Sequence, residues 1–188
     1  MKKERALEIK SLLAVYAALI LVSCLADRFS HQDFLWSWRS SRLNHISFVF
    51  VGGLFTVVYV GIAGLASRLF QWAEDLEKVF AQVLTPLSYF HIVILALLSG
   101  FVEEWFFRGI LMNHFGIIVS SLFFGLAHFL PDRNIWKWSL ISLVAGLALG
   151  LLYHWSESLW LVAIVHSSVN GLLFLRLNLL RISSPSLT

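Results

Sequence analysis

The sequence predicts an all-α fold, a polytopic transmembrane helix bundle with about six spans plus an amphipathic interfacial helix. Its 188 residues are 59% hydrophobic and 13% charged, with a mean hydropathy of +0.79. Soluble domains are about 45–50% apolar and about 25% charged. Apolar residues gather in six segments, and one stretch between them alternates apolar and charged residues at helical spacing. These three observations indicate an integral membrane protein.

The N-terminal part of the chain predicts two spans, at 11–26 and 46–66, followed by the interfacial helix at 67–84. A spanning helix needs about 20 residues, with a range of about 17–25, so the first segment is short. In 67–84 apolar residues recur every three or four positions with charges between them, which is typical of a helix lying at the membrane interface. Those charges come from Glu74, Asp75, Glu77 and Lys78.

Four further apolar segments follow, at 89–112, 116–130, 138–155 and 158–180. The segment at 116–130 is again short for a span. The chain shows no internal repeat and no linker, so we expect a single integral membrane domain over 1–188. Within it, 1–87 holds the two N-terminal spans and the interfacial helix, and 88–180 holds a helical core that we expect to be catalytic from the residues described below.

The charge distribution predicts an orientation and excludes one class of partner. A net charge of +3 with no basic run gives no nucleic-acid-binding patch. If all six segments span and the N-terminus is cytoplasmic, 10 Lys and Arg residues lie inside and 4 outside. The positive-inside rule therefore favours a cytoplasmic N-terminus, and we expect a bacterial inner (cytoplasmic) membrane.

Charged residues inside the third apolar segment are the first sign of function. Glu103, Glu104 and Arg108 occur in "LLSGFVEEWFFRGIL", where ionisable side chains cost several kcal/mol and therefore face the protein interior or water. Glu104 and Arg108 are four residues apart, on one helix face, so we interpret them as a structural or positioning pair. Glu103 is rotated by about 100° and needs another partner.

Counting positions along the helices places three more polar residues at about the same depth as Glu103. Measured from a turn near residue 115, Glu103 lies 12 positions before it and His128 lies 13 after it, so both are roughly 18–20 Å from the turn. In the last segment His166 and Asn170 are four residues apart, on one face, at a comparable depth. We therefore expect Glu103, His128, His166 and Asn170 to converge in a buried pocket.

One carboxylate, two imidazoles and an amide suit peptide hydrolysis. Glu103 would act as the general base on a water molecule, with His128 holding that water or carrying the proton. His166 and Asn170 would donate to the oxyanion. Phe124 is predicted to pack nearby, as a possible pocket wall.

Three motifs in successive apolar helices resemble a known family. "EEWFFR" fits EExxxR, "FGLAH" fits FxxxH over Phe124 to His128, and "HSSVN" fits HxxxN over His166 to Asn170. Together and in this order they resemble the CPBP family, which contains CAAX-type prenyl endopeptidases and bacteriocin-processing or immunity proteins. The resemblance covers roughly residues 90–175.

The resemblance implies a glutamic intramembrane endopeptidase that needs no cofactor. Glu103 would activate water with help from His128, His166 and Asn170 would form the oxyanion site, and Glu104 and Arg108 would be the positioning pair. CAAX endopeptidases of the family commonly have about eight spans, so this shorter chain looks more like bacterial members, including those that process C-terminal sorting tails. We expect it to cleave near the C-terminus of a membrane-associated or exported protein or peptide, from a pocket opening toward the outer half of the membrane.

Two other functions remain open from the sequence. Glu103, His128 and His166 plus water would also make a catalytic zinc site, although no HExxH motif is present. Alternatively, the chain is a non-catalytic immunity or scaffold protein in which the polar cluster only locks helices together.

Overall fold

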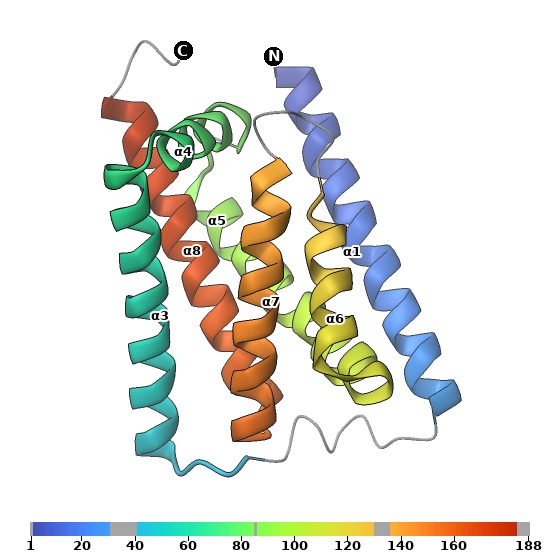
Figure 1. Cartoon of the computed structure of the whole chain (residues 1–188). Coiled ribbons are helices and arrows are strands. Elements are labelled where there is room, and N and C mark those ends of the chain that lie inside the picture. The colour runs from blue at the N-terminus through green and yellow to red at the C-terminus, as the bar shows by residue number, and fades with distance from the viewer. Residues whose placement is uncertain (1, 31–40, 85, 130–135, 184–188) are drawn as a thin grey trace.

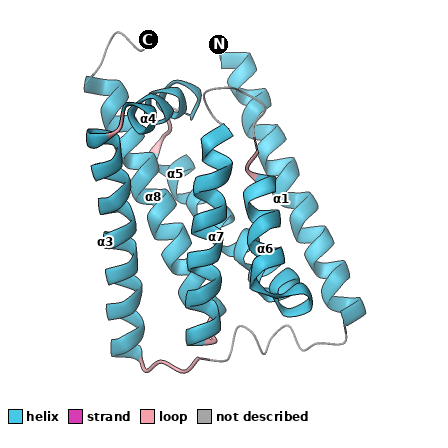
Figure 2. Ribbon diagram, viewed as in Figure 1, coloured by secondary structure: helices cyan, strands magenta, loops and turns pink. Residues whose placement is uncertain are grey.

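The computed structural model describes residues 2–30, 41–84, 86–129 and 136–183, and all their regular secondary structure is helical (Figure 2). The all-α prediction is therefore confirmed. In chain order the helices are α1 (Lys2–Ser30), α3 (His45–Leu69), α4 (Gln71–Leu84), α5 (Tyr89–Leu98), the π-helices η1 (Ser99–Glu103) and η2 (Trp105–Met112), then α6 (Asn113–Ala127), α7 (Trp136–Ser156) and α8 (Leu159–Ser183).

Four helical stretches are long and apolar enough to cross a membrane. They are His45–Leu69, Tyr89–Ala127, Trp136–Ser156 and Leu159–Leu180, and a shorter apolar helix covers Leu13–Ala26. The 39-residue stretch Tyr89–Ala127 contains a sharp bend at Gly116, whose φ of 80° and ψ of 171° are not helical. Positive φ is a conformation that glycine adopts at little cost. The bend separates the third and fourth predicted segments, so each of the six predicted segments lies mainly in a helix, with residue 130 of the fourth outside the described residues.

The long helices run alternately up and down, and the start of α1 and the end of α8 lie at the same end of the bundle (Figure 1). α1 leads away from that end, α3 returns to it, and the stretch from α5 to η2 leads away again. α6 returns, α7 leads away and α8 brings the chain back. We call this the terminal end, and the other, where the chain bends at Gly116, the distal end.

The amphipathic helix α4 lies across the terminal end of the bundle (Figure 1). Its bounds differ from the predicted 67–84, because α3 continues to Leu69 and the chain breaks at the extended residue Phe70. α4 buries Leu76 and Ala81. An ion pair between Glu77 and Arg176 of α8 ties it to the bundle.

α8 runs through the centre of the structure. Its residues Leu159, Leu161, Val162 and Val165 are almost fully buried and form a core with α7, while residues of α3 pack against it. Two glycines of α7, Gly146 and Gly150, lie against α6. A Cβ on Gly150 would lie 2.8 Å from Ile117 Cγ1, and one on Gly146 would lie 3.3 Å from Phe124. Glycine at these two positions lets α7 approach α6 closely.

Candidate active site

The segment that carries both glutamates is not a regular α-helix. α5 ends at Leu98, and the chain continues as the π-helices η1 and η2 on either side of Glu104. The sequence predicted one continuous α-helix here. π-helical turns are rare and are frequently found at functional sites. Glu103 and Glu104 lie where η1 meets η2, and both are buried.

Glu104 is held by two donors on one oxygen. Its Oε1 accepts from Arg108 Nη1 at 2.7 Å and from His166 Nδ1 at 2.7 Å. Glu104 is fully buried and Arg108 is 1% exposed, so each charge offsets the cost of desolvating the other. The pairing of Glu104 with Arg108 agrees with the four-residue spacing in the sequence, whereas the His166 contact was not foreseen.

Arg108 makes two further contacts that fix its guanidinium. Its Nη2 donates to the Gly146 carbonyl at 3.0 Å, and its Cζ lies 4.6 Å from the centre of the Phe124 ring. A planar guanidinium suits this combination of ion pair, carbonyl contact and aromatic face. Arg108 therefore links η2, α6, α7 and, through Glu104, α8.

Glu103 has different partners. Its Oε1 accepts a hydrogen bond of 2.9 Å from the Tyr16 hydroxyl of α1. Its Oε2 lies 3.7 Å from His128 Nε2 and has no hydrogen-bond partner among the described residues. His128 Nδ1 donates to the Phe124 carbonyl at 2.8 Å, so in the neutral ring the lone pair is on Nε2 and faces Glu103.

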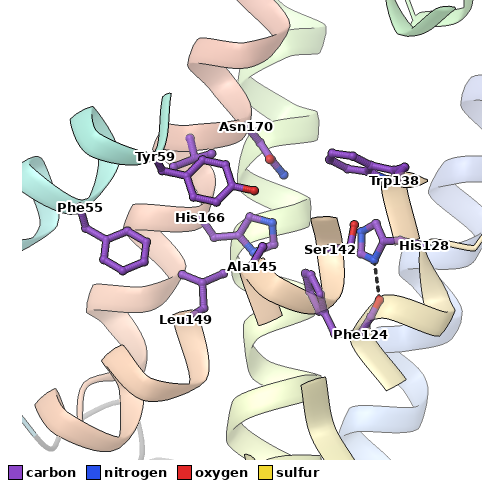
Figure 3. Close-up of a pocket in the computed structure, with 11 residues that line it drawn as sticks. Phe55, Tyr59, Phe124, His128, Trp138, Ser142, Ala145, Leu149, His166 and Asn170 are labelled. Carbon is purple, nitrogen blue, oxygen red and sulfur yellow. Dashed lines mark hydrogen bonds between the residues drawn. The ribbon is translucent and has the colours of Figure 1, made fainter. Parts of the chain in front are cut away.

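A pocket lies beside these residues, with His128, His166, Asn170 and Phe124 in its wall (Figure 3). It has about 40 Å³ of room for water-sized molecules, and one water needs at least about 10–15 Å³. Glu103 does not line it and reaches it only through His128. The sequence had placed Glu103 in the pocket itself. The other lining residues are Phe55, Tyr59, Trp138, Ser142, Ala145, Leu149 and Val169.

Asn170 and His166 each donate one hydrogen bond to a residue that does not line the pocket. Asn170 Nδ2 donates one of its two N–H groups to Ser99 Oγ at 2.8 Å. The second N–H remains as a donor for another acceptor. His166 donates through Nδ1 to Glu104, which leaves Nε2 as its second ring nitrogen. A ring that already donates from Nδ1 can also donate from Nε2 only when it is doubly protonated.

The pocket reaches toward the terminal end of the bundle. Trp138 is the third residue of α7, which starts at that end, and His128 directly follows α6, which ends toward it (Figure 1). The sequence predicts a pocket opening toward the outer half of the membrane, which is the side of the distal end if the N-terminus is cytoplasmic. This difference arises because the lining includes the early residues of α7, which the motifs do not mark.

Sequence reasoning missed Tyr16 as a partner of Glu103. The available signal was its hydroxyl in the apolar segment 11–26, because a buried tyrosine hydroxyl usually finds a hydrogen-bond partner. Zinc ligands were the other possibility raised for Glu103, His128 and His166. Within the described parts of the chain, no three His, Cys, Asp or Glu side chains are grouped as a metal site requires.

Comparisons with known proteins agree with the motifs. Residues 85–172 match the family model of type II CAAX prenyl endopeptidases, Rce1-like. The uncharacterized protein YpbD of Bacillus subtilis (strain 168) is 29% identical over 166 residues, which cover 81% of each chain. No solved structure matches the chain at a significant level. Residues 85–172, which hold all three motifs, are therefore similar to the type II CAAX prenyl endopeptidases, in agreement with the resemblance of the motifs to the CPBP family.

Proposed function

We propose that this protein is a glutamic intramembrane endopeptidase in which Glu103 and His128 activate a water molecule. One observation carries the proposal. Glu103 Oε2 is buried, has no hydrogen-bond partner among the described residues, and faces His128 Nε2 at 3.7 Å. A buried carboxylate oxygen without a donor costs free energy, so its presence here is better explained by a ligand than by packing.

We propose that a water molecule bridges these two atoms from one side. Both Glu103 Oε2 and the unprotonated Nε2 of His128 are acceptors, and a polar contact longer than about 3.5 Å can be completed by a water that donates to both groups. A water that donates one hydrogen to each would turn an oxygen lone pair outward. Because His128 lines the pocket, a substrate carbonyl in the pocket would meet that lone pair.

The hydrolytic step follows from this arrangement. As the water oxygen bonds to the scissile carbonyl carbon, one water proton passes to Glu103 and the carbonyl oxygen becomes an oxyanion. When the C–N bond breaks, that proton passes through Glu103 or His128 to the leaving amine. The products are a carboxylate and a protonated amine, and no other reactant is consumed. No metal ion takes part in the proposed step.

Asn170 and His166 are the proposed oxyanion donors. The second N–H of Asn170 is free to donate, since the first is bonded to Ser99. His166 can donate through Nε2 only as the doubly protonated ring, with its Nδ1–H still on Glu104. Removing one oxyanion donor typically costs about 10²–10³ in kcat.

The proposed substrate is a membrane-associated or exported protein or peptide that is cut near its C-terminus. The family model that matches residues 85–172 is named for CAAX prenyl endopeptidases. A prenylated CAAX tail, represented by a farnesylated peptide, is therefore the first substrate to test. We place the protein in a bacterial inner membrane with a cytoplasmic N-terminus. The pocket, which extends toward the terminal end, would then be reached from the cytoplasmic side.

The decisive test is Glu103→Gln in the full-length protein. Cells carrying the wild type, Glu103→Gln, or the exposed-site control Glu74→Gln are compared for protein level and for uncut C-terminal peptides by mass spectrometry. We expect Glu103→Gln to accumulate uncut proteins at a normal protein level, and Glu74→Gln to behave as wild type. Normal cleavage in Glu103→Gln would instead support an immunity or scaffold protein. Activity that a chelator abolishes and zinc restores would support the zinc enzyme.

The orientation has a separate test. Cys24 is the single cysteine, and after Cys24→Ser a new cysteine is placed at Gln82 in α4 or at Asn113 near the distal bend. A membrane-impermeant thiol reagent should label Gln82→Cys from the cytoplasmic side and Asn113→Cys from the outside. The opposite labelling would place the N-terminus and the pocket mouth on the outer side.

A further inference from the structure

The contact between Tyr16 and Glu103 joins the first helix to the proposed base. The Tyr16 hydroxyl donates to Glu103 Oε1 at 2.9 Å, across 87 residues of sequence, and Tyr16 is 8% exposed. It lies in α1, well outside the residues 85–172 that match the family model. The contact is therefore not part of the three motifs that define the site.

α1 turns one polar face toward the site. Tyr16 and Ser23, seven residues apart and hence on the same side of the helix, are its buried residues among those with described side chains. α1 packs against η1 and η2, the π-helices that hold Glu103. Its other faces carry exposed apolar side chains suited to lipid, namely Leu13, Val15, Ile20, Leu21, Val22 and Leu25.

The hydroxyl of Tyr16 determines which carboxylate oxygen is available. The last torsion of a glutamate is broad and roughly two-fold, so an unrestrained carboxylate rotates freely. A donor on Oε1 stops that rotation and leaves Oε2 directed at His128 Nε2. A phenylalanine would fill the same space without an O–H to satisfy, so packing alone does not require tyrosine here.

From these contacts we infer that Tyr16 is a positioning residue that holds Glu103 with Oε2 toward His128, which makes α1 part of the active site. This inference rests on the proposed function of Glu103. It assigns Tyr16 no contact with substrate. It predicts a loss of turnover rather than a loss of substrate affinity when the hydroxyl is removed.

The test is Tyr16→Phe in the full-length protein, with Ser23→Ala as the matched control. Ser23→Ala also removes a hydroxyl from the buried face of α1, but Ser23 Oγ has no hydrogen-bond partner among the described residues. The probe is a farnesylated peptide with a CAAX C-terminus, assayed below the melting temperature of every variant. We expect Tyr16→Phe to lower kcat by about 10-fold to 100-fold, because hydrogen bonds to charged groups are strong, with KM within about two-fold of the wild type. Ser23→Ala should keep the wild-type kcat.

A second measurement does not depend on the substrate. Melting temperatures of Tyr16→Phe, Glu103→Leu and the double variant form a cycle that isolates the interaction between the two side chains. We expect the double variant to be less destabilised than the two single changes added together. Additive shifts would overturn the inference, even if the farnesylated peptide proves not to be cleaved.

The kinetic outcomes separate this inference from the proposed function. Wild-type kcat in Tyr16→Phe, with Glu103→Gln inactive, would reject Tyr16 as a positioning residue and leave the proposed function standing. Full activity in Glu103→Gln would reject the proposed function itself. Equal losses of kcat in Tyr16→Phe and Ser23→Ala would mean that packing of α1 matters and the hydroxyl does not, which also overturns the inference.

Discussion

Gly100 sets how closely the glutamate-bearing segment approaches α8, and Gly100→Ala tests that contact. A Cβ at this position would lie 2.0 Å from Ser167 Oγ, 2.6 Å from the Ala163 carbonyl oxygen and 2.7 Å from Ser167 N. The Ser167 side chain can rotate away. The other two atoms belong to the backbone of α8 and can move only if η1 and α8 separate.

The size of the effect follows from these distances. Carbon atoms in favourable contact lie about 3.5–4.0 Å apart, so a Cβ at 2.6 Å from a backbone oxygen forces a shift on the order of 0.9 Å or more. Overpacking typically costs about 1–3 kcal/mol and occasionally more. Because backbone atoms are involved, we expect the steric cost to be about 3 kcal/mol. Alanine is favoured over glycine in a helix by roughly 1 kcal/mol, so the expected net loss of stability is about 2 kcal/mol.

The same shift should also impair activity. His166 follows Ala163 by one helical turn in α8, and its 2.7 Å contact with Glu104 lengthens beyond hydrogen-bonding range if η1 moves by that amount. We therefore expect Gly100→Ala to melt at a lower temperature and to lose peptide cleavage. The matched control is Gly53→Ala in α3, where a Cβ meets nothing within 4 Å. Gly100→Ala that is as stable and as active as Gly53→Ala would refute this account of the helix contact.

Three further predictions concern other polar groups that are buried or partly buried. Arg108→Met should destabilise the protein by about 3–5 kcal/mol in thermal melts, because it leaves a buried carboxylate without its cation; an unchanged melting temperature would contradict this. Ser139→Ala should cost about 1 kcal/mol, since Ser139 Oγ donates to a backbone carbonyl, whereas Ser142→Ala should be neutral or stabilising because Ser142 Oγ has no partner among the described residues. Arg176→Ala should increase proteolysis near α4 by removing its ion pair with Glu77, and equal cleavage in both proteins would argue against that link.

The sequence contained enough information to predict depth along the helices. Counting from the turn placed Glu103 and His128 at one level, and in the structure their side-chain atoms are 3.7 Å apart. The four-residue spacing of Glu104 and Arg108 likewise corresponds to their ion pair. Both predictions depend on the rise per residue and on the position of a turn, which the sequence supplies directly.

Rotation about the helix axes could not be predicted in the same way. The sequence does not mark the change from α5 to η1 and η2, and that change alters which neighbour each residue faces. For this reason the contact of His166 with Glu104, and the position of Glu103 outside the pocket wall, were not foreseen. Nor does the sequence indicate against which helix α1 packs, so Tyr16 had no predicted partner.

The two adjacent glutamates differ in what they can do, although the motif makes them look alike. Both have an Oε2 without a partner among the described residues. Glu104, however, is bound to a buried guanidinium and to His166 through its other oxygen, and taking up a proton would break a buried ion pair, a change that costs several kcal/mol. Glu103 has only a neutral hydroxyl on its other oxygen and faces an imidazole that lines the pocket. Accepting a proton from water would therefore not break a buried ion pair at Glu103, and this is why we propose Glu103 as the base and Glu104 as a structural residue.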